Sequence, residues 1–161
     1  MKHEDNLERM IKLADEFFKT KSDPDQISIS KESMQKLRRI HPGCLKEKRD
    51  KNGPIAWILV MPTTRELMNK FLRKKINEQQ LLDQTLPGRK YDSLYLCSAL
   101  VLPEHRGKGF ARLLVSRAIT SIRRQHPIKQ LFYWAFSAEG KGLAASVARE
   151  FNLPLHARKQ L

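Results

Sequence analysis

Residues 106–111, with the sequence RGKGFA, have the types and spacing that bind phosphate. They follow a nearly unbroken apolar run at 94–102, which predicts a strand, and they precede a helical pattern with Phe110, Leu114 and Ala118 on one face. A strand that leads through a glycine-containing turn into a helix gathers free backbone N–H groups at the positive end of the helix dipole. Glycine also lets the backbone approach an anion without an intervening side chain. The segment therefore predicts a cradle for phosphate or pyrophosphate.

Spacing excludes two common phosphate-binding loops. The nucleotide P-loop requires G-x-x-x-x-G-K-(S/T), and the sequence contains no such run. The dinucleotide fingerprint requires G-x-G-x-x-G, but Gly107 and Gly109 supply only its first half and Arg112 stands in place of the third glycine. What remains is R-x-x-G-x-A, formed by Arg106, Gly109 and Ala111 after Val-Leu-Pro-Glu.

The strand, the Pro-Glu turn, this motif and the amphipathic helix, in that order, resemble the acyl-CoA-binding segment of the GNAT superfamily of N-acyltransferases, whose motif reads (R/Q)-x-x-G-x-(G/A). The resemblance is specific over about 94–114 and looser to residue 151; before residue 54 it rests on element order. It implies an α/β fold with a mixed central sheet flanked by helices, in a single domain over residues 1–161. It also implies transfer of an acetyl group from acetyl-CoA, without a metal, to a primary amine of an unidentified small-molecule or protein acceptor.

The resemblance further implies which residues hold the cofactor. The N–H groups of residues 106–111 would bind the pyrophosphate, and the strand before them, which should separate from the next strand, would pair with the pantetheine arm. The N–H near Val101 would face the thioester oxygen, and Ser137 would meet pantetheine from the other side or simply cap the last helix. The implied cofactor residues are Leu100, Val101, Leu102, Arg106, Gly107, Lys108, Gly109, Phe110, Ala111, Arg112 and Ser137.

The sequence marks the general acid and the general base of such a reaction less clearly than it marks the cofactor site. The family's frequent acid is a tyrosine in a last-helix pattern like A-x-x-L-Y, and aligning Ala144 and Val147 with that pattern places Ala148 at the tyrosine position. Some members carry a glutamate base early on the long strand, where this sequence has Ser93 beside Asp92. The remaining candidates for proton transfer are Tyr133, Asp92 and Ser146. Because the usual tyrosine is missing, an acyl-CoA-binding protein of this fold with little or no transfer activity is the alternative.

The amino-acid composition limits the class of protein and the binding partners that can be expected. The chain of 161 residues carries 31 Lys and Arg against 17 Asp and Glu, a net charge of +14. Such a charge attracts CoA, itself a polyanion, but could equally reflect an acidic acceptor or nucleic acid, and no nucleic-acid-binding motif accompanies it. The charged N-terminus and the lack of an apolar run of ~18 residues favour a cytoplasmic protein that is not in a membrane. The two cysteines, Cys44 and Cys97, form no disulfide framework or metal-ligand pattern, and Cys97 is expected as a buried thiol in the long strand.

Periodicity and turn residues predict the elements around this motif. A turn at 22–25 should end the first helix, Ser30 should cap the second, Asn52-Gly53 should close a hairpin, and Thr63 with Glu66 should form a capping box. The largely helical segment 62–90 stands where the family has a short turn, and it could form part of the acceptor pocket, a lid or a surface decoration. Residues 26–29 are the only candidate for the family's first strand. We expect helices at 4–19, 30–40, 64–72, 78–83, 109–124 and 139–151, and strands at 45–49, 55–61, 93–102, 131–136 and 155–159.

Overall fold

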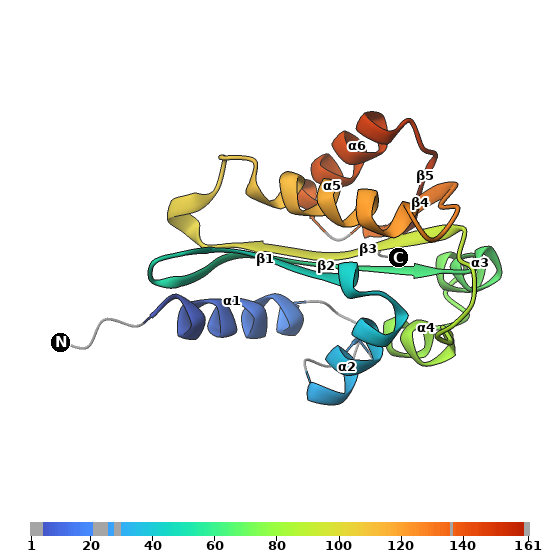
Figure 1. The fold of residues 1–161 in the computed structure, drawn as a ribbon, viewed down its shortest axis with the longest axis horizontal. Helices are drawn as coiled ribbons and strands as arrows, with labels where there is room; N and C mark the ends of the chain where they lie inside the picture. Colours follow the sequence, from blue (N-terminus) through green and yellow to red (C-terminus); the bar gives the residue numbers. More distant parts are fainter. Residues whose placement is uncertain (1–4, 21–25, 28–29, 136, 160–161) are drawn as a thin grey trace.

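A five-stranded mixed sheet with the strand order β1-β2-β3-β4-β5 forms the centre of the molecule (Figure 1). The computed structural model describes residues 5–20, 26–27, 30–135 and 137–159. The strands β1 (Leu45–Asp50), β2 (Gly53–Thr63) and β3 (Ser93–Val101) are antiparallel, and β4 (Gln130–Ala135) and β5 (Leu155–Lys159) continue the sheet in parallel. The expected α/β class with a mixed sheet is confirmed.

Helices cover both faces of this sheet (Figure 1). On one face lie α1 (Asn6–Thr20) and α2 (Lys31–Ile40), and on the other α5 (Phe110–Arg123) and α6 (Ala138–Phe151). The expected insertion forms α3 (Arg65–Leu72) and α4 (Glu78–Gln84), at the end of the sheet where β3 begins. Two short 3₁₀ turns, η1 (Pro42–Cys44) and η2 (Pro103–His105), precede β1 and the glycine loop. Strands buried on both faces explain the long apolar runs of β2 and β3.

The strands β3 and β4 separate part-way along their length. Their pairing runs from Ser93↔Gln130 to Leu96↔Tyr133, whereas β3 continues to Val101. On its other side, β3 pairs Leu96 with Val60 and Ser98 with Leu59, which leaves Cys97 as an extra residue in a β-bulge. A bulge bends its strand and increases the local twist. The sheet therefore opens beyond Leu96 and Tyr133, as the resemblance implies.

Most of the predicted helix caps and turns are confirmed, but the predicted N-cap of α3 is wrong. The Ser30 hydroxyl accepts from the N–H of Ser33 and begins α2. Thr63, expected as an N-cap, is the last residue of β2, where it pairs with Ser93 and its hydroxyl bonds Thr85 at 2.7 Å. Sheet pairing extends the backbone one residue further than the pattern suggested, so Thr64 caps α3 instead. The turn at 22–25 and residues 28–29 lie outside the described residues, and residues 26–27 are not in a strand.

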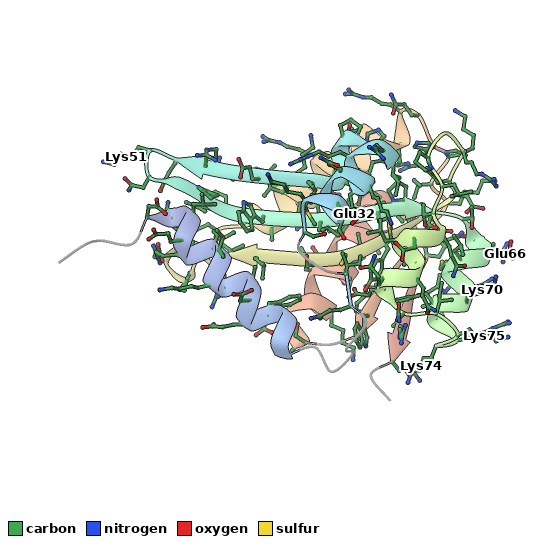
Figure 2. The ribbon with its side chains drawn as sticks, turned by 90° about the horizontal axis from the view of Figure 1, so that it is seen from below. Glu32, Lys51, Glu66, Lys70, Lys74 and Lys75 are labelled. Carbon is green, nitrogen blue, oxygen red and sulfur yellow. The ribbon has the colours of Figure 1, made fainter. Side chains whose placement is uncertain are left out.

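The charged side chains are dispersed rather than gathered into one tail. Figure 2 shows Lys51 at the β1–β2 turn and Lys70, Lys74 and Lys75 around the end of α3, at opposite ends of the molecule and pointing outward. Lys70 lies 3.6 Å from Glu66, one helical turn away. An exposed pair of this kind contributes about 0.3–0.5 kcal/mol. These four lysines therefore occupy two separate regions of the surface.

Two histidines near the end of α5 should make stability depend on pH. His41 is buried, and its ring lies 5.9 Å from the ring of His126, which also contacts Tyr91 at 4.7 Å between centroids. Burial lowers the pKa of both histidines, helped by the positive charge of Lys46 on His41 and by His41 and Lys90 on His126. The unfolded chain therefore binds more protons below the ordinary histidine pKa of about 6.5, and stability falls as the pH drops through that range.

We expect the melting temperature to fall by a few degrees between pH 7.5 and pH 5.5, since about 1 kcal/mol shifts it by about 2–4 °C in a chain of this size. Differential scanning fluorimetry of His126→Gln should show a weaker pH dependence. The matched variant His156→Gln removes an exposed histidine of β5 and should leave the dependence unchanged. If the melting temperatures of the wild type and of His126→Gln depended equally on pH, the proposed role of His126 in the pH dependence of stability would be contradicted.

Candidate functional site

A cleft of about 720 Å³ occupies the space where β3 and β4 separate. One part of its wall comes from the glycine loop, the start of α5 and the start of α6. Another part comes from α1, on the opposite face of the sheet (Figure 1). The cleft therefore connects the two faces of the sheet through the gap between the strands. Apolar side chains form most of its wall, as in other small-molecule sites.

The glycine loop fits the anion cradle that the sequence predicts. Gly107 and Gly109 have φ angles of +79° and +81°, a region that side chains disfavour. A Cβ added at either glycine would have no atom within 4 Å, so both face open space. Gly109 is the N-cap of α5 and has no side chain to cap the helix, so the first N–H groups of α5 face the loop. The Arg106 side chain donates from Nε to the carbonyl of Val101 at 3.0 Å, which holds the loop against β3.

Ion pairs fix the segment that precedes this loop. The guanidinium of Arg9 donates to both carboxylate oxygens of Glu104 at 2.6 Å, so α1 is joined to η2. This hydrogen-bonded pair lowers the pKa of Glu104 from 4.5 to about 2. His105 lies 3.8 Å from Asp50 at the tip of the hairpin, and its ring also approaches Phe110. The loop is thus supported by α1, by β1 and by its own helix.

Most of the residues implied for the cofactor come together at the cleft. Leu102 and Lys108 are the two exceptions. Leu102 is buried and donates its N–H to the carbonyl of Ile55 at 3.0 Å, and Lys108 is exposed outside the cleft wall. Ser137 lines the cleft and also caps α6 by accepting from Gly140 at 3.0 Å. The cleft is lined by Leu100, Val101, Arg106, Gly107, Gly109, Phe110, Ala111, Arg112 and Ser137.

The three candidates for proton transfer lie in different places. Tyr133 lines the cleft and occupies the last register position before the strands separate. Asp92 lies just before β3, at the end of the strand away from the cleft, and accepts a hydrogen bond from Ser93. Ser146 lies in α6 outside the cleft wall, and Ala148 of the same helix is buried. Only Tyr133 of the three lies at the cleft.

Several cleft residues have no local signal in the sequence. Leu13, Glu16 and Phe17 of α1 line the cleft, although they are more than 80 residues from the glycine loop. Cys97 and Trp134, the first residues beyond the last strand pair, also line it. The helical periodicity of α1 could have suggested that Phe17 packs inward, but not against which surface.

Comparison with known proteins identifies the family. The sequence matches the acetyltransferase (GNAT) family over residues 9–147, so the chain belongs to the GNAT family of acetyltransferases. No curated protein is significantly similar to it in sequence. Among solved structures, Naa20 of Chaetomium thermophilum, determined in complex with a bisubstrate analogue, is similar with 19% identity and a TM-score of 0.41. That match covers 73% of this chain and 53% of the other, so the chain spans about half the length of Naa20.

The described part of the chain offers neither a metal-binding cluster nor a membrane-spanning helix. Among the described residues, no group of three or more His, Cys, Asp or Glu side chains is arranged to hold a metal ion. Over the same residues, no helix combines the length and apolar character that crossing a bilayer requires.

Proposed function

We propose that this chain is one N-acetyltransferase domain that transfers an acetyl group from acetyl-CoA to a primary amine. The observation that carries the proposal is the cleft between β3 and β4 with the glycine loop at its edge. A pyrophosphate requires free N–H groups in open space, and Gly107 and Gly109 provide that space. A pantetheine arm requires an unpaired strand edge, and β3 beyond Leu96 provides one toward β4.

The residues at the cleft divide into binding and chemical roles. The N–H groups of residues 106–111 would hold the pyrophosphate, with Arg112 adding positive charge, and Val101 and Ser137 would hold the pantetheine arm. When bound, acetyl-CoA supplies an activated acyl thioester. The N–H near Val101 would donate to the thioester oxygen. Tyr133, where β3 and β4 separate, would protonate the departing sulfur.

Binding is tested by thermal shift with acetyl-CoA, with CoA and with NAD as the unrelated nucleotide control. A ligand present at 100 times its Kd stabilises the folded state by about 2.7 kcal/mol. We expect a shift with both CoA compounds and none with NAD. If neither acetyl-CoA nor CoA shifts the melting temperature, the proposal is overturned. Release of free thiol in the presence of spermidine, phenethylamine, lysine amide or short peptides then tests transfer.

A second candidate function is acyl-CoA binding without transfer. The observation in its favour is Ala148, a buried small residue at the position where the family frequently has a tyrosine acid. A thermal shift with acetyl-CoA, combined with no thiol release across the amine panel, would select this candidate over an acetyltransferase.

Replacing Tyr133 by phenylalanine should separate chemistry from binding. The variant keeps the aromatic ring that lines the cleft but removes the hydroxyl, so we expect kcat to fall about tenfold or more with little change in the Kd for acetyl-CoA. Steady-state thiol release and thermal shift measure the two quantities. A kcat equal to that of the wild type would remove Tyr133 from the mechanism and leave protonation of the sulfur to water.

A further inference from the structure

The cleft has two halves, one on each face of the sheet. Leu100 of β3 packs with Met10 and Ala14 of α1 on one face. Successive side chains of a strand point to opposite faces, so Val101 points to the other face, where α5 lies (Figure 1). We call the part of the wall that the glycine loop and the starts of α5 and α6 form the loop half. The part on the face of α1 is the α1 half.

The strand register places two further wall residues in the α1 half. Ser98 lies two residues before Leu100 on β3 and pairs with Leu59 of β2. Side chains two residues apart on a strand share a face, and directly paired residues share it too. The bulge of β3 lies before Ser98, so the alternation from Ser98 to Leu100 is unbroken. The α1 half is therefore lined by Leu13, Glu16, Phe17, Leu59, Ser98 and Leu100.

Acetyl-CoA and its acceptor require different halves of the cleft. The proposed function places the pyrophosphate on the glycine loop and the pantetheine arm along the free edge of β3. Acetyl-CoA then fills the loop half and brings its thioester to the gap between β3 and β4. An acceptor amine must reach the same carbonyl carbon without crossing the bound cofactor. Its approach therefore runs through the α1 half, on the other face of the sheet.

The α1 half combines a buried apolar part with a carboxylate at its outer end. Leu59 and Leu100 are buried, with 7% and 9% of their surface exposed, whereas Glu16 is exposed. Of the described α1 residues in the wall, Leu13 and Phe17 are apolar and Glu16 is acidic. An acceptor that fits such a half has an aliphatic segment next to the reacting amine and a positive charge at its far end.

Charge differs between the two halves of the cleft. Arg106 and Arg112 line the loop half, where their positive charges suit the anionic CoA. The chain carries a net charge of +14, and the field of that charge repels a cationic acceptor. The carboxylate of Glu16 offsets this repulsion locally, on the side from which the acceptor enters. The α1 half therefore favours cationic acceptors over neutral or anionic ones.

Resting on the proposed acetyltransferase function, we propose that Glu16 makes the α1 half a subsite for diamines, in which an aliphatic chain joins the reacting amine to a second, positively charged amine. The carboxylate of Glu16 binds the second amine, which is an ammonium ion at neutral pH because alkyl amines have pKa values near ~10. Leu59 and Leu100 cover the aliphatic chain. Glu16 lies away from the reacting atoms, so it determines specificity and takes no part in the chemistry. An exposed ion pair of this kind strengthens binding by up to about fivefold.

Two series of CoA conjugates test the subsite without turnover. In both, an acetamide bridge joins the CoA sulfur to an alkyl chain, propyl to octyl in length, which ends in an ammonium group in one series and in a hydroxyl group in the other. Calorimetry of the wild type should give a Kd about three- to fivefold lower for the ammonium conjugate at the chain length that fits best. In Glu16→Gln the two Kd values should become equal, and in Glu16→Lys the hydroxyl conjugate should bind more tightly. Equal Kd values for the two series at every length in the wild type would overturn the proposal.

Thiol release extends the test to acceptors that react. Hexamethylenediamine, aminohexanol and aminohexanoate share one chain and differ in the charge of the far group. The kcat/KM of the wild type should fall in this order, by about threefold or more at each step after correction for the two equivalent amines of the diamine. The differences should lie in KM with little change in kcat, and Glu16→Lys should reverse the order. The original order retained in Glu16→Lys would overturn the proposal.

Two variants are matched controls for charge and for position. Asp15→Lys makes the same change of charge on the same turn of α1, but Asp15 is exposed outside the cleft wall, so the preference for the diamine should remain. Glu139→Gln removes a carboxylate that lines the cleft from the first turn of α6, and it too should keep the preference. A preference lost in either control and kept in Glu16→Gln would overturn the proposal.

The outcomes separate this inference from the proposed function. If acetyl-CoA and all the conjugates fail to bind, the proposed function is overturned and the subsite with it. If the conjugates bind without a preference for the ammonium group, only the diamine subsite is overturned. A preference that depends on Glu16, together with no thiol release from any amine, would support the subsite and select acyl-CoA binding without transfer.

Discussion

Replacement of Gly109 by valine should abolish the binding of acetyl-CoA while the protein still folds. Gly109 has φ 81° and ψ 14°, and open space surrounds the position where its Cβ would lie. That space is where we place the pyrophosphate, so a valine side chain would occupy it and displace the first N–H groups of α5. A side chain in the left-handed region also costs roughly 1–2 kcal/mol, and more for a β-branched residue. We expect at least about a 100-fold loss of affinity, equivalent to about 2.7 kcal/mol, measured by calorimetry.

Gly88→Val is the matched control for backbone strain. Gly88 has φ +80°, nearly the value of Gly109, and it too has no atom within 4 Å of an added Cβ. It lies in the loop before β3, outside the cleft wall. The two variants should lose similar stability, and only Gly109→Val should lose binding. Normal affinity in Gly109→Val would exclude the glycine loop from the acyl-CoA site.

The geometry of the glycine loop could be predicted because its signals are consecutive in the chain, whereas its role in holding a cofactor stays a prediction. The apolar run of β3, the two glycines with positive φ and the amphipathic pattern of α5 occupy one stretch from Ser93 to Arg123. Local backbone geometry is sufficient to build an anion cradle from such a stretch. The same reasoning explains why the hairpin at Gly53 and the cap at Ser30 were predicted correctly.

The rest of the cleft could not be predicted in the same way, because tertiary packing assembles it. A base expected early on β3 led to Asp92 and Ser93, but the bulge at Cys97 opens the cleft at the other end of that strand. Glu78, the first residue of α4, accepts a hydrogen bond from the cleft residue Cys97, although the place of this insertion could not be read from its helical pattern. Nothing in the sequence indicates that a charged residue at the start of a short helix has no exposed surface.

Removal of the Phe71 ring should cause the largest loss of stability among the variants considered. Phe71 of α3 has no exposed surface, and its ring meets those of Tyr95 at 4.9 Å and Phe132 at 5.9 Å, with Arg158 stacked on it. Phe71→Ala should therefore lower the free energy of unfolding by about 3–5 kcal/mol. The melting temperature should fall by roughly 10 °C, measured by calorimetry or by circular dichroism.

This result tests two of the three roles that the sequence leaves open for residues 62–90, the lid and the surface decoration. A lid or a surface decoration would contribute little to global stability, because its contacts open without unfolding the sheet. Leu86→Ala is the control within the same segment: Leu86 is 48% exposed, so its truncation should cost less than about 0.5 kcal/mol. A large loss for Phe71→Ala and a small one for Leu86→Ala would mean that the insertion is part of the core between β3 and β5.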